Sequence, residues 1–109
     1  MEFACGLDGS RAGAVSLRET DGGLRLEVDS PWGRVTYSQF TLVTVLHAVT
    51  SRSAAALYAV DHELAPFWCP TCKAVYCGAH WESWDVWDEG LFDQTRGRCP
   101  RGHERMLLD

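Results

Sequence analysis

The chain has 109 residues, a formal net charge of −5 and an apolar fraction of 46%. Five tryptophans in a chain of this size favour a packed globule over a disordered segment. The length predicts a single domain over residues 1–109. With this net negative charge, the chain does not show the basic character that binding to phosphate backbones requires, so nucleic acid is not the expected partner.

The N-terminal sequence MEFACGLDGS has neither a basic opening nor an apolar run, so we expect no signal peptide. The longest apolar run, AAALYAV, is far shorter than the roughly 20 residues that a membrane span needs. We therefore expect a cytoplasmic protein that does not bind a membrane. In a reducing compartment, cysteines at CxxC spacing favour metal or redox chemistry over structural disulfides.

The first third of the chain predicts an antiparallel β-meander. Short runs of strand-forming residues, EFAC, GAVSLRE, LRLEV and GRVTYS, are separated by segments rich in glycine and aspartate. The DGG sequence at 21–23 predicts a tight hairpin, because glycine supplies the positive φ of primed turns. Leu24, Leu26 and Val28 alternate with charged residues, and this period of two predicts one buried face.

The middle third predicts two helices. The SQFTLVTVLHAV sequence contains apolar and histidine residues that recur at a spacing of three to four, as a helix requires: Phe40, Val43, Leu46 and His47. A second helix is predicted to begin after Ser53 as its N-cap and to end before Pro66. The face expected to be apolar in this helix comprises Ala55, Leu57, Tyr58, Val60 and Leu64.

The last third contains three pairs of residues with the spacing of metal ligands. They are Cys69-Pro-Thr-Cys72, Cys77-Gly-Ala-His80 and Cys99-Pro-Arg-Gly-His103. Zinc prefers four tetrahedral ligands, and chains commonly supply thiolate and imidazole in such pairs. A single CxxC is a weak signal, but three pairs within one short segment strongly indicate zinc. The absence of a βαβ pattern argues against a thioredoxin-like redox pair, and the histidines argue against an iron–sulfur cluster.

Six ligands do not divide into sets of four. Either one zinc site is filled and one pair is spare, or a fourth pair exists elsewhere. Cys5-Gly-Leu-Asp8 has suitable spacing, and a carboxylate oxygen is an accepted zinc ligand. Adding this pair gives eight ligands and two Zn²⁺ ions, which we favour over one. The alternative makes Cys5 a buried strand residue and Asp8 a turn residue.

The pairing of these ligands is a question of geometry. The AVY sequence after Cys72 has strand composition, and at about 3.3 Å per residue it would carry Cys77 more than about 10 Å from the first metal. We therefore favour one site that contains Cys69, Cys72, Cys99 and His103. The second would contain Cys5, Asp8, Cys77 and His80. The competing arrangement places Cys69, Cys72, Cys77 and His80 on one ion and requires the intervening residues to loop.

These motifs resemble known zinc-binding modules. CPTC together with CPRGH resembles the two knuckles of zinc-ribbon proteins, and VYCGAH is similar to the YCxxH portion of AN1-type and B-box zinc fingers. The resemblance covers residues 69–103 and departs from AN1 fingers, in which the first CxxC is much farther from YCxxH. The string PFWCPxC…YCxxHW…CPxGHER also looks like small uncharacterised bacterial proteins, a resemblance that implies no activity.

Three tryptophans follow the second ligand pair. Trp81, Trp84 and Trp87 have the i, i+3, i+6 spacing that lines residues along one side of a short helix. We expect them to close a core over the metal site. The alternative is an exposed aromatic surface for a partner.

Together these patterns predict an α+β fold. It would consist of an N-terminal antiparallel β-meander, two central helices, and a C-terminal zinc-stabilised module of a β-hairpin and a short helix. The break at Pro66 leaves open a division into lobes 1–65 and 66–109. A lobe as small as the second would depend on its metal.

The ligand count predicts a binding role rather than catalysis, because four protein ligands leave no open position on zinc. We expect structural zinc and a protein partner, as in a regulatory adaptor. One alternative is a nucleic-acid-binding ribbon, which would rest on Arg96, Arg98, Arg101 and Arg105. The other is a zinc hydrolase, in which Asp8 does not bind and Cys5, Cys77 and His80 leave an open site on the ion. Its general base would be Glu82 or another nearby carboxylate.

Overall fold

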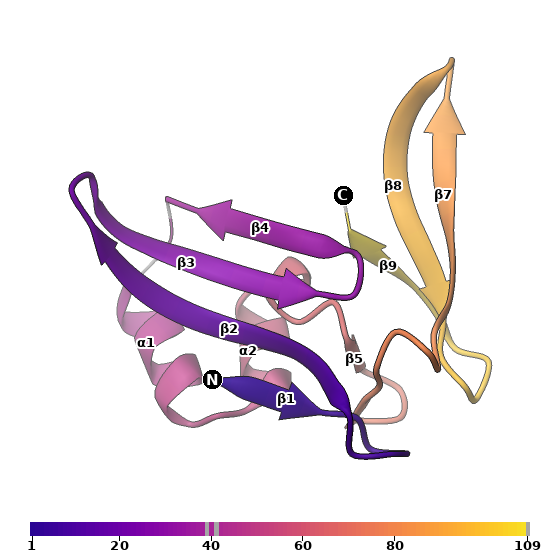
Figure 1. The fold of residues 1–109 in the computed structure, drawn as a ribbon, viewed down its shortest axis with the longest axis horizontal. Coiled ribbons are helices and arrows are strands. Elements are labelled where there is room, and N and C mark those ends of the chain that lie inside the picture. Colours follow the sequence, from indigo (N-terminus) through magenta and orange to yellow (C-terminus); the bar gives the residue numbers. More distant parts are fainter. Residues whose placement is uncertain (39, 41, 109) are drawn as a thin grey trace.

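The computed structural model of the protein describes residues 1–38, 40 and 42–108. Within these residues it has three antiparallel sheets and two α-helices, which confirms the α+β class (Figure 1). The strands are β1 (Glu2–Ala4), β2 (Arg11–Thr20), β3 (Gly23–Ser30), β4 (Gly33–Tyr37), β5 (Trp68–Cys69), β6 (Ala74–Val75), β7 (Glu82–Asp88), β8 (Leu91–Arg98) and β9 (Glu104–Leu108). The helices are α1 (Leu42–Thr50), α2 (Ala54–Val60) and the short 3₁₀ helix η1 (His62–Leu64).

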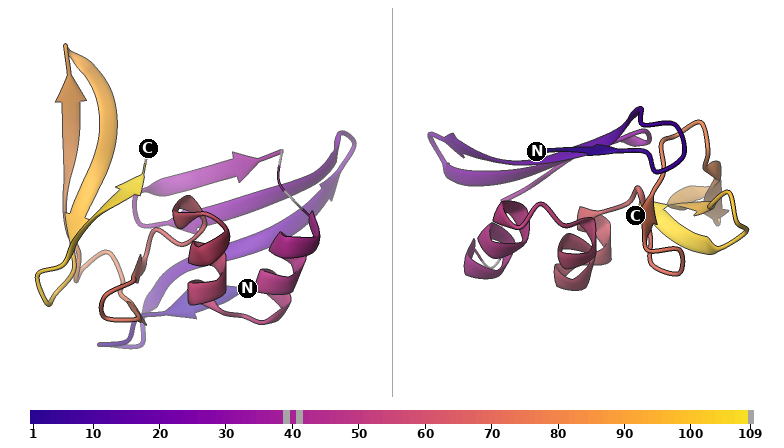
Figure 2. Two further views of the ribbon diagram at one scale, coloured as in Figure 1. Left: turned by 180° about the vertical axis from the view of Figure 1, so that it is seen from behind. Right: turned by 90° about the horizontal axis from the view of Figure 1, so that it is seen from below.

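The N-terminal sheet is the predicted meander, with strand order β1-β2-β3-β4. Thr20 pairs with Gly23 across the two-residue turn of Asp21 and Gly22, so the hairpin forms where the sequence predicts it. The positive φ of 104° belongs to Gly23, directly after the turn, and neither central residue has a positive φ, so the predicted primed turn is wrong. Leu26 and Val28 are buried, whereas Leu24 at the hairpin end is 37% exposed. Figure 2 shows both α-helices against one face of this sheet, so the buried face of the strands and the helices enclose one core.

Helix α1 forms where the sequence predicts it, but the residues whose spacing predicts the helix are not the ones that it buries. Its buried residues are Val45 and Ala48, whereas Val43 is 79% exposed and Leu46 is 46% exposed. Leucines and valines surround most of this helix, so their spacing alone does not select one face. Packing against the sheet makes the selection, and it leaves an apolar strip in contact with solvent.

Helix α2 begins as predicted and ends earlier. The Ser53 hydroxyl accepts a hydrogen bond from the backbone N–H of Ala56 at 3.1 Å, as an N-cap does. The helix ends at Val60, because Asp61 leaves the helical conformation and its carboxylate accepts from the N–H of Glu63. Leu57 and Leu64 of the predicted face are buried, Tyr58 and Val60 are half-buried, and Ala55 is exposed.

The C-terminal module contains two small sheets and no short helix within the described residues. The segment predicted to be a tryptophan-lined helix is strand β7, which pairs with β8 in the order β7-β8-β9. In a strand, residues three apart point to opposite faces, so Trp84 and Trp87 separate, and Trp81 lies just before the strand. Trp81 is buried, Trp84 is half-buried and Trp87 is 62% exposed. The expectation of a closed core therefore holds for Trp81 only.

Neither α-helix in the described part of the chain is long and apolar enough to cross a membrane.

Residues from both expected lobes belong to one core. Phe67 lies so close to strand β2 that a Cβ atom on Gly13 would be 2.4 Å from its ring. The Phe67 ring also packs on Phe3, with centroids 5.0 Å apart. Glycine at position 13 is therefore a condition for this packing of residues 66–108 on the N-terminal sheet.

Buried Arg105 on β9 fastens the C-terminal sheet to the segment that leaves α2. Its Nη1 donates to the carbonyl oxygens of Ala65 (2.9 Å) and Trp68 (2.7 Å), and its Nη2 donates to that of His62 (3.0 Å). Its guanidinium lies over the ring of Tyr58, 5.1 Å from the centroid. Arg105 thus lies in the interior and does not belong to the surface arginine cluster expected from the sequence.

Replacing Arg105 with leucine would remove the side-chain donor shared by these three carbonyl groups. The carbonyl oxygens of Ala65 and His62 would keep only the backbone N–H donors of Trp68 and Ala65, at 3.2 and 3.4 Å. We expect Arg105→Leu to lower the free energy of unfolding by about 3 kcal/mol, measured by urea denaturation. Arg98→Leu is the matched control, because Arg98 is half exposed and its ion pair with Glu82 is 3.8 Å long. It should cost less than about 1 kcal/mol. Equal effects of the two substitutions would contradict the role assigned to Arg105.

Candidate metal centres

Four residues from two turns converge in what we call the three-thiol cluster: Cys69, Cys72, Cys99 and His103. The first two flank the tight turn between β5 and β6, and the last two flank the turn between β8 and β9. Lys73 has a φ of 54°, which brings the chain back into β6 directly after Cys72. The two turns are distant in the sequence, and their ligand atoms lie within 4.8 Å of one another.

The distances within the three-thiol cluster match those around a tetrahedral zinc ion. Because Zn–S bonds are about 2.3 Å and Zn–N bonds about 2.0–2.1 Å, such an ion separates two sulfurs by about 3.8 Å and a sulfur from a nitrogen by about 3.5 Å. The Sγ atoms of Cys72 and Cys99 are 3.8 Å apart. The His103 Nδ1 atom is 3.2, 3.4 and 3.7 Å from the three sulfurs. Each of the five cysteines of the chain is a free thiol.

The backbone of both turns is arranged to stabilise thiolates. The N–H of Cys72 donates to the Sγ of Cys69, and the N–H of His103 donates to the Sγ of Cys99, each at 3.4 Å. Burial raises the pKa of Cys69 to about 11. Burial also opposes ionisation of Cys99, but hydrogen bonds from the N–H groups of His103 and Arg101 outweigh it and lower the pKa of that thiol. A divalent cation would favour the thiolate form of every sulfur in the cluster.

Tyr76 lies beside the three-thiol cluster, and Trp81 packs on Tyr76. A hydrogen bond to Cys72, together with burial, raises the pKa of the Tyr76 hydroxyl to about 12, so this hydroxyl remains a donor to sulfur. The Trp81 indole N–H donates to the carbonyl oxygen of Tyr76 at 3.0 Å, and the two rings meet edge to face. No role for Tyr76 was expected from the sequence, although its position one residue before Cys77 places it between two of the ligand pairs.

The two-thiol cluster consists of Cys5, Asp8, Cys77 and His80. Its first pair lies in the turn between β1 and β2, and its second lies in the loop between β6 and β7. The Asp8 Oδ2 atom is 3.0 Å from the His80 Nε2 atom and 3.6 Å from the Cys77 Sγ atom. The four ligand atoms lie within 4.8 Å of one another, so this cluster also surrounds a volume of the size of one ion.

The electrostatics of the two-thiol cluster favour charged ligands. Hydrogen bonds from the Ser10 hydroxyl and its backbone N–H lower the pKa of Asp8 well below its ordinary value. For Cys5, burial opposes ionisation, but backbone N–H groups outweigh it and lower the pKa of the thiol. Ser10, which the sequence analysis did not single out, thus holds the Asp8 carboxylate in place. Its position two residues after an aspartate was the available signal.

The structure groups the eight candidate residues as the favoured sequence arrangement does. Cys77 and His80 lie with Cys5 and Asp8, so the competing arrangement with Cys69 and Cys72 on the same ion is wrong for this fold. The physical reason is the one expected, because β6 extends the chain away from the first turn. Metal ligation by these residues itself remains a prediction. Neither His47 nor His62 belongs to a metal-capable group of the described residues.

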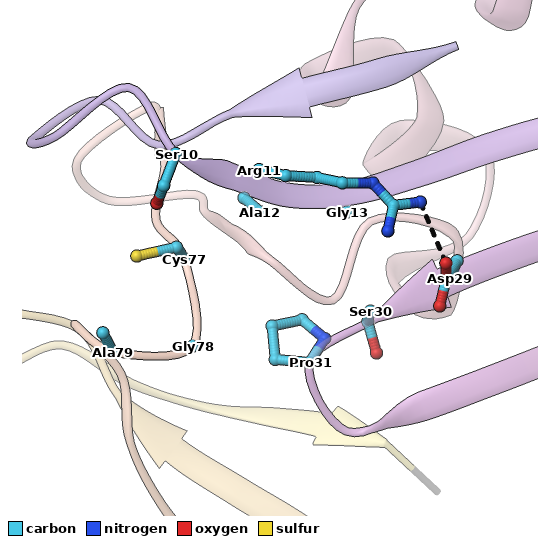
Figure 3. A pocket seen from close by; sticks show the side chains of 10 residues that line it. All are labelled: Ser10, Arg11, Ala12, Gly13, Asp29, Ser30, Pro31, Cys77, Gly78 and Ala79. Carbon is cyan, nitrogen blue, oxygen red and sulfur yellow. Dashed lines mark hydrogen bonds and ion pairs between the residues drawn. The ribbon is translucent and has the colours of Figure 1, made fainter.

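A surface pocket of about 440 Å³ lies beside the two-thiol cluster. It is bounded by the start of β2, the turn after β3 and the Cys77–Ala79 loop, and the ion pair of Arg11 with Asp29 lies along it (Figure 3). In Figure 3 the Cys77 sulfur points away from Asp29 and Pro31. Cys77 is the member of the two-thiol cluster that lines this pocket.

The arginines expected to form a nucleic-acid surface do not form one patch. Arg105 is buried, as described above, and Arg96 pairs with Glu104 at 3.0 Å. Arg98 lies over the ring of Trp84, 5.7 Å from its centroid, and 3.8 Å from a carboxylate oxygen of Glu82. Neighbouring carboxylates therefore share the charges of Arg96 and Arg98, and Arg101 is exposed.

A family model described as a domain of unknown function, DUF8328, matches residues 1–109, and the chain belongs to this family. No curated protein and no solved structure matches the chain.

The grouping of ligands predicts how zinc content responds to single substitutions. We expect wild-type protein to carry two zinc ions per chain, and Cys5→Ser and Cys77→Ser each to carry one, because both remove a ligand of the two-thiol cluster. Zinc content is measured by elemental analysis of purified protein. Ser16→Ala, in the middle of β2, is the control and should retain both ions. Two ions in Cys5→Ser would remove Cys5 from the ligand set.

Proposed function

We propose that this DUF8328 domain binds two structural Zn²⁺ ions and acts as a rigid adaptor for a protein partner. The observation that carries the proposal is the arrangement of eight donor atoms in two groups of four, each group within 4.8 Å. The donor types, thiolate, imidazole and carboxylate, are those that zinc prefers. Both groups join turns that are far apart in the sequence, as a structural metal does.

The donor count supports a structural role rather than a catalytic one. A catalytic zinc keeps one position for water or substrate, whereas each cluster here supplies four protein ligands. The hydrolase alternative required Asp8 to stand away from the metal. Its carboxylate instead lies 3.0 Å from the His80 ring. With no open position on either ion, the proposed activity is recognition.

The small elements around the clusters support metal dependence. Strands β5 and β6 have two residues each, and an isolated hairpin of this size is not stable in water. Structural zinc contributes about 10 kcal/mol or more of apparent binding free energy. This is comparable to the whole stability of a small domain, so bound zinc decides whether residues 66–108 fold. The free thiols fit a reducing compartment such as the cytoplasm.

Removal of zinc should unfold the C-terminal module. We expect a chelator to collapse the dispersed amide NMR signals of β8 and β9 and to abolish the near-ultraviolet circular dichroism of buried Trp81. Renewed addition of zinc should restore both signals, because the ligands bind the ion only when they are brought together. A chelated sample that keeps both signals and holds no metal would contradict the proposal.

A further inference from the structure

The β7–β8 ribbon extends away from the rest of the molecule (Figure 1) and carries apolar side chains at its tip. Leu91 is 74% exposed, Trp87 is 62% exposed and Phe92 is 44% exposed. The rings of Trp87 and Phe92 meet edge to face with centroids 5.8 Å apart. Exposed apolar groups that cluster in this way mark interaction surfaces.

The tip is ordered by a tight turn. Glu89 and Gly90 have φ values of 51° and 82°, the positive values that a two-residue turn of type I′ requires at both positions. The register shift between Val86 and Trp87 leaves Asp93 of β8 as the extra residue, so β7 itself keeps a regular alternation. The surface is therefore set before any partner binds, which lowers the entropic cost of binding.

The outer edge of β7 is open to another strand. The sheet order is β7-β8-β9, so β7 has a neighbour on one side only. In the described part of the chain, no backbone hydrogen bond from another strand reaches that outer edge. An edge of this kind is a template for an added strand, and backbone hydrogen bonds then supply part of the affinity.

Charge along β7 decides which strand fits. Glu82, Asp85 and Asp88 recur at every third position of the strand and all are exposed, with Asp85 on the opposite face from the other two. The Glu82 carboxylate lies 3.8 Å from Arg98, and the Asp85 carboxylate accepts a hydrogen bond from the Thr95 hydroxyl at 2.9 Å. If a second copy paired antiparallel with full overlap, Glu82 would lie opposite Asp88 and Asp85 opposite its own counterpart. Like charges placed directly opposite destabilise a strand pair, so this edge excludes a second copy. The same carboxylates favour a strand with cations at the matching positions.

We infer that β7 binds an extended, basic segment of another protein as an added strand. The segment carries arginine or lysine at every third position and apolar residues between them. Its cations lie opposite Glu82, Asp85 and Asp88, and its apolar residues contact Trp84, Val86 and Trp87. This inference rests on the proposed function, because the turn at Cys99 and His103 of the three-thiol cluster anchors β8 and β9.

The register defines a probe peptide. The peptide Arg-Val-Val-Arg-Val-Thr-Arg would pair antiparallel with β7, with its first residue opposite Asp88 and its last residue opposite Glu82. We expect this peptide to bind the zinc-loaded chain saturably and to shift the amide NMR signals of β7 together with the indole signal of Trp87. A peptide of the same composition with its three arginines adjacent should bind about threefold more weakly, because cross-strand charge pairs then lose their register. A peptide with proline in place of its two adjacent valines should bind about tenfold more weakly. One of two consecutive N–H groups must face β7, and proline cannot donate that backbone hydrogen bond.

Variants of the protein distinguish binding at the β7 edge from non-specific attraction of a basic peptide to an acidic protein. Asp88→Asn should weaken binding about threefold, whereas Glu19→Gln, which removes an exposed carboxylate on β2, should leave the dissociation constant unchanged. Trp87→Ala should weaken binding and remove the indole shift. Equal binding of all three peptides, or equal effects of Asp88→Asn and Glu19→Gln, would overturn the inference.

Two further readouts keep the inference distinct from the proposed function. A dimer of the free chain that the peptide does not disrupt would overturn the inference in favour of a second copy on β7. Zinc content, measured on the same samples, tests the proposed function by itself. Peptide binding to a metal-free folded chain would refute structural zinc and leave the strand edge supported. Two bound zinc ions without peptide binding would refute the strand edge alone.

Discussion

Convergence of ligand atoms from distant turns is the constraint on which the C-terminal half of this structure depends. Cys69 and Cys72 meet Cys99 and His103, and the turn after β1 meets the loop after β6. An ion bound at each cluster would cross-link these segments. It would add to the apolar packing that the C-terminal part already contributes through Phe67, Trp68, Tyr76, Trp81 and Leu107.

Other contacts join the C-terminal segments to the rest of the molecule. The Arg105 side chain connects β9 to the segment that follows α2, and Phe67 connects the same segment to strand β2. Trp81 packs on Tyr76, which lies next to the three-thiol cluster, and its ring also contacts that of Trp32 in the turn after β3. The ribbon of β7 and β8 is thereby held at its base, while its tip remains exposed. A rigid base with an exposed aromatic tip is an arrangement suited to binding a partner.

Some elements of the fold could be predicted from the sequence and others could not, for physical reasons. The meander and the Ser53 cap depend on local rules, a period of two and a capping hydroxyl, and both were predicted. The grouping of ligands was also predicted, because β6 is extended and carries Cys77 away from Cys72. The buried face of α1 was not, since apolar residues surround that helix and only the sheet selects Val45 and Ala48. The strand at Trp84 and Trp87 was missed because a three-residue spacing also suits a helix, and pairing with β8 decides between the two.

The most direct test of the account is the zinc environment in purified wild-type protein, measured by X-ray absorption at the zinc edge. The two clusters together predict five sulfur ligands and three nitrogen or oxygen ligands shared between two ions. Average coordination should therefore be fourfold and rich in sulfur, with Zn–S distances of about 2.3 Å. Zinc surrounded only by nitrogen and oxygen, or a folded chain that contains no metal, would contradict it.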